Sequence, residues 1–380
     1  MANGRIALIL GGGGARAAYQ VGVLRAIRDL LDDGRQNPFQ ILCGTSAGAV
    51  NAATLACYAH NFSDAVDAMD DVWANMHAGQ IYRADPLGIS LAVLRWLSAF
   101  LFGWALKRSP RSLLDNQPLR HLLEKKLHFR NIERSLANGT LYAISITASG
   151  YATGDGVSFF EACPEVTSWR RTQRVGCRTQ LSVEHLMASS AIPFIFPAVH
   201  LNREYFGDGS MRQLSPISPA IHLGADKILV IGVGKKSEVS QRQSSRSYPT
   251  LAQIAGHALS SIFLDSLAVD IERMERINRT LASLPGALRE GGEVGLRPIE
   301  SLIIAPSESL DQLAARHARA LPWAVRLLLR GLGAMNRRGG ALTSYLLFEQ
   351  SYTSALIDLG HRDAMARQDD VKAFLATERI

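Results

Sequence analysis

Cysteine is scarce in this sequence, and no two cysteines form a Cys-x-x-Cys pair. The 380 residues hold four of them, at well-separated positions: Cys43, Cys57, Cys163 and Cys177. Structural zinc sites and disulfide-rich scaffolds depend on clustered or numerous cysteines. The sequence therefore argues against both, and we expect the four thiols to be reduced.

A secretory signal is also missing from the first residues. Such a signal needs an apolar stretch of about 7–15 residues and a small-residue cleavage site. Here the apolar run Ile6–Leu10 has five residues and leads directly into Gly11–Gly14. We interpret this run as a buried first strand and expect a cytoplasmic protein.

Charged residues are few, and those of positive sign predominate. They make up 20% of the chain, and 41 Lys and Arg against 34 Asp and Glu give a net charge of +7. Hydrophobic residues make up 47%, which excludes a wholly disordered chain. The basic surplus suits an anionic membrane surface or nucleic acid and does not decide between them. No internal repeat is present.

The first 60 residues of the chain predict an α/β fold. Strand Ile6–Leu10, a glycine turn and a helix over Ala15–Leu31 are followed by strand Ile41–Cys43, a second glycine turn and a helix over Ala47–His60. This alternation is typical of a mostly parallel sheet. Further strands are expected downstream, at Leu141–Thr147, Val157–Phe160, Lys227–Val233 and Leu302–Ala305.

One apolar segment stands apart, at residues 89–106. It contains several aromatic side chains and one charge, Arg95, and is followed by Lys107, Arg108 and Arg111. A membrane span needs about 20 apolar residues with few charges. A core helix and a true span remain alternatives, but the aromatic and basic flanks favour a helix that lies on a membrane or covers an apolar site, with residues 89–111 contacting anionic lipid.

The pentapeptide Gly44-Thr45-Ser46-Ala47-Gly48 predicts a nucleophile. In a Gly-x-Ser-x-Gly turn between a strand and a helix, the serine adopts a strained conformation that needs small neighbours. Its hydroxyl is then held at a helix N-terminus, where backbone N–H groups favour negative charge. We expect Ser46 to be a nucleophile. The alternative is a simple Gly-rich turn, which can have the same sequence.

The glycines after the first strand predict an anion site. Consecutive glycines let backbone N–H groups converge without obstruction by Cβ atoms. Residues 12–17 satisfy the relaxed dinucleotide fingerprint, so a cofactor pyrophosphate is one candidate anion. The other is the oxyanion of an intermediate on Ser46, held by Gly12, Gly13 and Gly14 together with Ala47. The second strand ends in the serine turn rather than in an acidic residue, which favours the oxyanion.

Asp208 is the candidate base for this serine. None of the ten histidines lies in a distinctive small-residue turn, whereas Asp208 is set between Gly207 and Gly209. A tight turn of this kind allows close backbone approach, and an ordinary Asp-Gly turn between strands is the alternative. Because an unperturbed Asp has a pKa of about 3.9, burial beside Phe194, Phe196 and Phe206 is expected to raise it.

Taken in order, these motifs resemble those of the patatin-like phospholipases. The resemblance covers roughly Ile6–Ile231. Its motifs are the oxyanion block Gly12–Arg16, the elbow Gly44–Gly48, the dyad motif Asp208-Gly209-Ser210, and between them the block Ala188–Pro197, whose Pro193, Phe194 and Phe196 are expected to line the site. Two small residues, Ala17 and Ser210, depart from the family pattern.

The resemblance implies a three-layer α/β/α fold and hydrolysis of lipid acyl esters by a Ser46–Asp208 dyad. It implies a phospholipid or lysophospholipid substrate, with no cofactor, metal or nucleic-acid partner, and leaves the oligomeric state open. We expect residues 6–231 to form the hydrolase core, with a helical apolar insertion at 87–110, and residues 232–380 to form a helical extension packed on it. The alternatives are a dinucleotide-binding protein using Gly12–Ala17 and an inactive membrane-associated scaffold.

Overall fold

The computed structural model describes most of the chain. The described residues are 4–85, 112–234, 250–262, 266–283, 296–331, 333–334 and 340–376, with positions 88, 90, 94 and 98. The expected insertion at 87–110 and the expected membrane contact at 89–111 therefore lie outside the described residues, apart from those four positions. No helix among the residues described is long and apolar enough to cross a bilayer.

A single sheet organises the molecule. Its main path runs in the order β10 (Glu300–Ile304), β9 (Lys227–Ile231), β1 (Ile6–Leu10), β2 (Ile41–Thr45), β3 (Ala143–Gly150), β4 (Gly156–Ala162), β6 (Arg174–Arg178) and β5 (Trp169–Arg171). The first five strands along this path are all parallel to one another, and β4 is antiparallel to β3. A hairpin of β7 (Val199–Leu201) and β8 (Glu204–Asp208) joins the sheet antiparallel to the end of β3.

The central strands β1, β2, β3 and β4 are buried on both faces, and their side chains point into two separate cores. On β1, Leu8 and Leu10 point into the larger core, whereas Ala7 and Ile9 point into the smaller one. Alternation between the faces follows from the two-residue period of a strand. Because each face is apolar, each must be covered by helices, which gives three layers.

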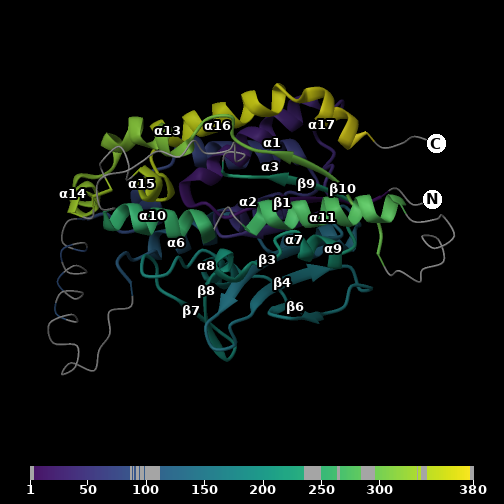
Figure 1. Cartoon of the computed structure of the whole chain (residues 1–380), viewed down its shortest axis with the longest axis horizontal. Helices are drawn as coiled ribbons and strands as arrows, with labels where there is room; N and C mark the ends of the chain where they lie inside the picture. The colour runs from purple at the N-terminus through teal and green to yellow at the C-terminus, as the bar shows by residue number, and fades with distance from the viewer. Residues whose placement is uncertain are drawn as a thin grey trace.

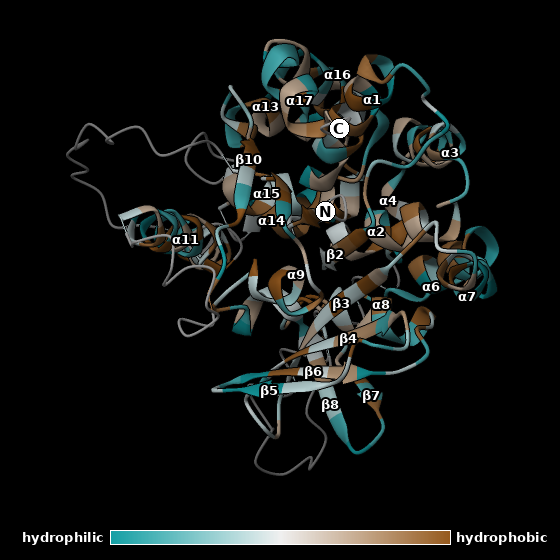
Figure 2. Ribbon diagram, turned by 90° about the vertical axis from the view of Figure 1, so that its right-hand side faces the viewer, coloured by the Kyte–Doolittle hydropathy of each residue, from teal (hydrophilic) through white to brown (hydrophobic). Residues whose placement is uncertain are grey.

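Figure 2 shows α9 (Ser218–His222) and α11 (Ser266–Ser283) on one side of the sheet and α2, α3, α6 and α7 on the other. The larger core also receives α1 and α16, which pack on each other. The bounds of the helices on this larger side are α1 Ala18–Leu30, α2 Ala47–Cys57, α3 Phe62–Ala74, α4 Ala78–Ile81, α6 Gln117–Lys126, α7 Arg130–Ala137, α8 Val183–Ser189, α13 Leu310–His317, α14 Trp323–Gly331, α15 Gly340–Leu346, α16 Gln350–Met365 and α17 Gln368–Leu375. Helix α10 spans Leu251–Ser260 and packs on α15.

These observations confirm the expected three-layer α/β/α architecture with a helical C-terminal region. The C-terminal part also contributes the edge strand β10, which pairs in register with β9. Figure 1 shows α16 and α17 lying over the layer that contains α1 and α3, with α14 and α15 at the end of the molecule opposite the two termini. The division of the chain at residue 231 stays a prediction, but both parts share one sheet and one core.

Candidate active site

Ser46 lies at the sharp turn between β2 and α2. Its backbone has φ 55° and ψ −131°, a combination that L residues adopt rarely and at a cost on the order of 1–3 kcal/mol. Close packing beneath the turn makes the glycines necessary: a Cβ on Gly48 would lie 2.2 Å from the carbonyl oxygen of Leu10. The turn therefore holds the serine against the end of β1, next to the glycine loop.

The Ser46 side chain meets Asp208. The hydroxyl of Ser46 donates to Oδ2 of Asp208 with an oxygen–oxygen distance of 2.6 Å, and both residues are buried. Asp208 ends β8, where Gly209 begins the short 3-10 helix η2 (Gly209–Arg212). The two residues that the sequence analysis singled out as nucleophile and base are thus in hydrogen-bond contact.

Burial sets the electrostatics of Asp208. The side chain is 1% exposed, and its Oδ1 accepts from the Ser210 backbone N–H at 2.9 Å. Burial raises the pKa of Asp208 to about 6, while the hydrogen bonds from Ser46 and Ser210 oppose that rise. The expected rise is therefore present, although Phe194, one of the rings thought to cause it, is 72% exposed.

The neighbouring Ser189 anchors the elbow from behind. Its hydroxyl oxygen accepts from the backbone N–H of Ser46 at 2.8 Å, and its hydroxyl donates to the carbonyl of Thr147 at 2.6 Å. The Ser46 amide is therefore engaged by Ser189. At the next position, Ala47 begins α2, where helix N–H groups lack an acceptor within the helix.

The glycine loop after β1 lies beside this helix start. Gly14, with φ +55°, lines the same cavity as Ser46 and Ala47, and it leads into the 3-10 helix η1 (Gly14–Ala17). Gly12 and Gly13 are buried in the loop and do not line the cavity. Of the four expected oxyanion donors, Gly14 and Ala47 are therefore the two placed at the cavity wall.

Residues from the C-terminal region hold the other side of this loop. A Cβ on Gly14 would lie 2.2 Å from the carbonyl oxygen of Tyr345. Arg16 is 3% exposed, forms a salt bridge with Asp311, donates to the Ser344 hydroxyl and lies 4.0 Å above the Tyr345 ring. The arginine thus ties the loop to α13 and α15. The whole segment Gly14–Ala17 is buried.

A chain of buried polar side chains connects the loop to the cavity. Gln20 donates to the carbonyl of Gly11 at 2.8 Å and accepts from Asn51 at 2.9 Å, and Asn51 in turn accepts from the indole N–H of Trp73 at 2.9 Å. Gln20 and Asn51 are fully buried. We call Gln20, Asn51 and Trp73 the polar chain.

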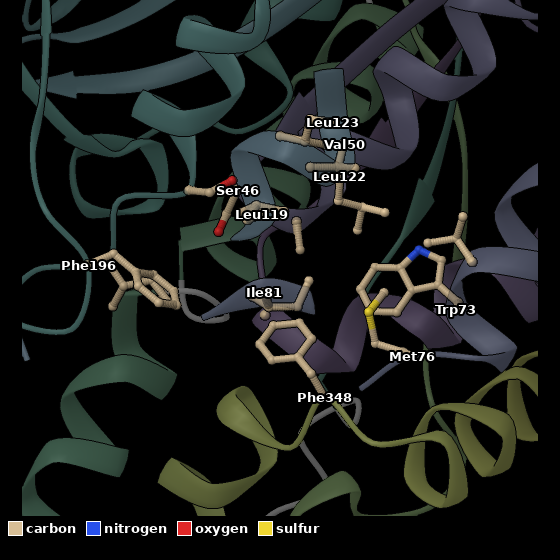
Figure 3. Close-up of a pocket in the computed structure, with 15 residues that line it drawn as sticks. Ser46, Val50, Trp73, Met76, Ile81, Leu119, Leu122, Leu123, Phe196 and Phe348 are labelled. Atoms are coloured by element: carbon tan, nitrogen blue, oxygen red, sulfur yellow. The ribbon is translucent and has the colours of Figure 1, made fainter. Parts of the chain in front are cut away.

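The cavity beside Ser46 is apolar and has a volume of about 60 Å³. Figure 3 shows Ser46 and Phe196 on one side, and Trp73 and Met76 on the other. One polar group on its wall is the buried Ser190 hydroxyl, which has no hydrogen-bond partner in the described structure. The apolar wall is formed by Val50, Val72, Trp73, Met76, Ile81, Leu119, Leu122, Leu123, Ile192, Phe196 and Phe348.

Of the three residues expected to line the site, one lies in the cavity wall. Phe196 lies in the cavity wall as expected, whereas Pro193 and Phe194 do not line it. Phe194 has φ +64° and points outward, so the expectation that it lines the site is corrected. The left-handed backbone conformation of Phe194, which could not be predicted from the sequence, directs the ring away from the cavity.

Most residues of the cavity wall were not predicted from the sequence. Trp73, Met76 and Phe348 are far from any motif, and the signal that could have found them was only their apolar character. In the described part of the chain no histidine lines the cavity, and no cluster of three or more His, Cys, Asp or Glu side chains is suited to a metal ion. The polar side chains described at the cavity are those of Ser46 and Ser190, with Asp208 bonded to Ser46.

Comparison with known proteins gives one matching family model and 16 similar chains among the solved structures. A family model described as patatin-like phospholipase matches residues 8–221, more than half of the chain. VipD from Legionella pneumophila is 12% identical with a TM-score of 0.34, and the match covers 97% of this chain and 67% of that one. Human GIVD cytosolic phospholipase A2, in complex with methyl gamma-linolenyl fluorophosphonate, is 13% identical with a TM-score of 0.42. That match covers 98% of this chain, which spans 59% of the human one. No curated protein matches the sequence significantly.

Proposed function

The chain belongs to the patatin-like phospholipase family, and from this we propose that it is a serine esterase that cleaves fatty-acyl esters of phospholipids or lysophospholipids. Family membership supports lipid acyl hydrolysis in general. The observation that carries the finer proposal is the 2.6 Å contact between Ser46 and Asp208 at the wall of an apolar cavity. An apolar cavity suits a fatty-acyl chain, because burial of each methylene contributes about 0.8 kcal/mol.

In the proposed mechanism the acyl group passes through an enzyme ester. The Asp208 carboxylate accepts the Ser46 proton as Oγ attacks the ester carbonyl carbon. The resulting oxyanion is held by backbone N–H groups of Ala47 and the glycine loop, where each donor is worth on the order of 10²–10³ in turnover. Collapse of the intermediate breaks the bond to the alcohol, which takes the proton from Asp208.

Water completes the cycle. It attacks the acyl-enzyme carbonyl while Asp208 accepts its proton, and the fatty acid leaves as that proton returns to Ser46. A base whose pKa is about 6 is ionised at neutral pH and still accepts a proton more readily than an ordinary aspartate. Burial of Asp208 therefore favours both tasks.

The direct test replaces each member of the dyad. Ser46→Ala and Asp208→Asn are each expected to reduce hydrolysis of a short-chain ester and of mixed phospholipid vesicles by at least about 10³-fold, as for other catalytic dyads and triads. Circular dichroism should show an intact fold. A fluorophosphonate probe is expected to label Ser46, as located by mass spectrometry, and not the Ser46→Ala protein.

The matched control is Ser135→Ala, a buried serine on α7 that does not line the cavity and that should leave hydrolysis unchanged. Undiminished activity in Ser46→Ala would contradict the proposal. Absence of any turnover or labelling in the unaltered protein would instead favour the inactive scaffold, for which Ala17 and Ser210 are the motivating departures.

A further inference from the structure

Helix α14 (Trp323–Gly331) presents an apolar face that the core does not use. Ala324, Val325 and Leu329 are buried against the protein, whereas Trp323 is 60% and Leu327 63% exposed. Large apolar side chains scattered singly over a surface are ordinary, but two on one face of a helix form a patch. We call Trp323 and Leu327 the apolar patch of α14.

The helix period places a positive charge beside this patch. Residues four apart on an α-helix lie about 40° apart around its axis, and residues seven apart about 20°. Trp323, Leu327 and Arg330 therefore share one face, and Arg326 lies at its border. Arg330 is exposed, so apolar and cationic groups are presented together.

The sequence around α14 is rich in arginine and has no acidic residue to balance these positive charges. Between Gln312 and Phe348 there are six arginines and no acidic residue. Four of these arginines, Arg316, Arg319, Arg326 and Arg330, are described, and none of them forms a salt bridge with another described residue. Arg326 donates to the backbone carbonyl of Arg319, which joins the start of α14 to the segment before it. Arginines without an acidic partner, close in sequence to an exposed tryptophan and leucine, are complementary to an anionic lipid surface.

The patch lies at the catalytic end of the molecule. Helix α15, which follows α14, packs on the glycine loop through Tyr345, and its Thr343 hydroxyl donates to the carbonyl of Ala334 just after α14. Figure 1 shows α14 beside α15, at the end opposite the two chain termini. A surface that binds α14 therefore approaches the end of the sheet where Ser46 lies.

We propose that the apolar patch of α14, with Arg316, Arg319, Arg326 and Arg330, docks the protein on an anionic bilayer. Trp323 and Leu327 enter the boundary between head groups and acyl chains, and the arginines pair with lipid phosphates. This contact orients the catalytic end towards the lipid. The docking itself holds whether or not Ser46 is a nucleophile, so its test is separate from that of the proposed function.

The test measures binding of the full chain to vesicles by co-sedimentation. We expect binding to vesicles of phosphatidylcholine with about one third phosphatidylglycerol, weaker binding to phosphatidylcholine alone, and a decrease as salt is raised. The double variant Trp323→Ala/Leu327→Asp is expected to lose roughly tenfold or more in affinity. Arg326→Gln/Arg330→Gln is expected to lose about fivefold per charge on anionic vesicles only.

Val269→Asp is the matched control, because Val269 is 56% exposed on α11, in the layer on the opposite face of the sheet. It should bind vesicles as the unaltered protein does. The two α14 variants and Val269→Asp should hydrolyse a soluble short-chain ester normally, which separates docking from chemistry. Ser46→Ala should lose hydrolysis but still bind vesicles.

Equal vesicle affinity for the unaltered protein and the α14 double variant would overturn the proposal. If the double variant also differed in solution mass, measured by analytical ultracentrifugation, the patch would be assigned to contact with a second copy.

Discussion

The strands that carry Ser46 and Asp208 meet end to end along one edge of β3. Thr45, the last residue of β2, is opposite Thr147, and Asp208, the last residue of β8, is opposite Ala148. The other edge of β3 is occupied by β4 at the same positions, so β2 and β8 must share the free edge. β2 and β8 run in opposite directions and end next to each other. This brings the side chains of Ser46 and Asp208 into contact, although they are 162 residues apart in sequence.

This arrangement predicts a pH-dependent activity. The proposed base must be ionised to accept the Ser46 proton, and burial raises the pKa of Asp208 to about 6. Hydrolysis of a soluble short-chain ester should therefore rise between about pH 5 and 7, with a midpoint near 6, rather than near the value of about 4 of an exposed aspartate. Initial rates at saturating and low substrate across this range measure it, and a midpoint near 4 would contradict it.

The same burial predicts that Asp208 destabilises the fold at neutral pH. Because its pKa is higher in the folded protein than the ordinary 3.8, the folded state holds more protons between about pH 4 and 6, and stability falls as pH rises through that window. Asp208→Asn removes this penalty and should increase the free energy of unfolding at pH 7.5 by on the order of 2–3 kcal/mol. Urea unfolding at pH 4.5 and 7.5 tests this, and a gain that is the same at both pH values would speak against ionisation as its cause.

A second prediction concerns the glycine under the elbow. A Cβ at position 48 would collide with the Leu10 carbonyl oxygen, a backbone atom that cannot turn away, so Gly48→Ala should destabilise the protein by several kcal/mol or prevent folding. At Gly79, in α4, an added Cβ would meet no described atom from elsewhere in the chain within 4 Å. Gly79→Ala should be neutral or stabilise by up to about 1 kcal/mol. Similar urea midpoints for the two variants would refute the steric argument.

A third prediction concerns the polar chain. Gln20 fixes the Gly11 carbonyl, and because a trans peptide is planar, this also fixes the opposite direction of the Gly12 N–H. Gln20→Met should lower kcat by roughly 10- to 100-fold and change KM little, since small displacements at a catalytic site have large effects. Gln20→Glu keeps the acceptor for Asn51 and loses the donor to Gly11, so it should resemble Gln20→Met.

The control for the polar chain is Ser215→Ala, which removes a buried hydrogen bond to Asp270 on the opposite side of the sheet. It should reduce stability without lowering kcat. A loss of stability in Gln20→Met with an unchanged kcat would show that the polar chain is structural and does not position the glycine loop.

A fourth prediction concerns acyl-chain length. Met76 lies across the cavity from Ser46, so Met76→Ala should lengthen the space for the acyl chain. The ratio of kcat/KM for long-chain to short-chain esters should rise by up to about fourfold for each methylene newly accommodated. Met187→Ala is matched in burial and does not line the cavity, so both variants should lose about 2–5 kcal/mol of stability while only Met76→Ala changes the ratio. An unchanged ratio in Met76→Ala would place the acyl chain elsewhere.

The parts of the fold that local chemistry dictates were predictable from sequence. Ile6–Leu10 is a strand with the expected bounds, and the glycines around Ser46 specify a strand, a tight turn and a helix because other residues would collide there. The family resemblance, confirmed by the match over residues 8–221, placed Asp208 in the same site. Motifs of this kind record short-range backbone constraints, which is why they can be read in a single sequence.

The cavity wall was not predictable in the same way. Phe348 reaches the cavity from beyond the region of resemblance, and Phe194, inside that region, turns outward. Which apolar side chain faces a cavity depends on how the helices pack. The sequence pattern of an apolar residue is the same whether it lines the cavity or lies in one of the cores. Arg16 shows the same limit, because its partners Asp311 and Ser344 lie about 300 residues further along the chain.

The contact between Gly14 and Tyr345 has a consequence for protein synthesis. A nascent polypeptide that has emerged from the ribosome only as far as Ile231 already contains Ser46 and Asp208 but lacks the helices that enclose the glycine loop. Since chains emerge from the N-terminus onwards, the loop gains its final surroundings only after Tyr345 has also emerged. The glycine loop therefore reaches its final packing well after the segments that carry Ser46 and Asp208 have been synthesised.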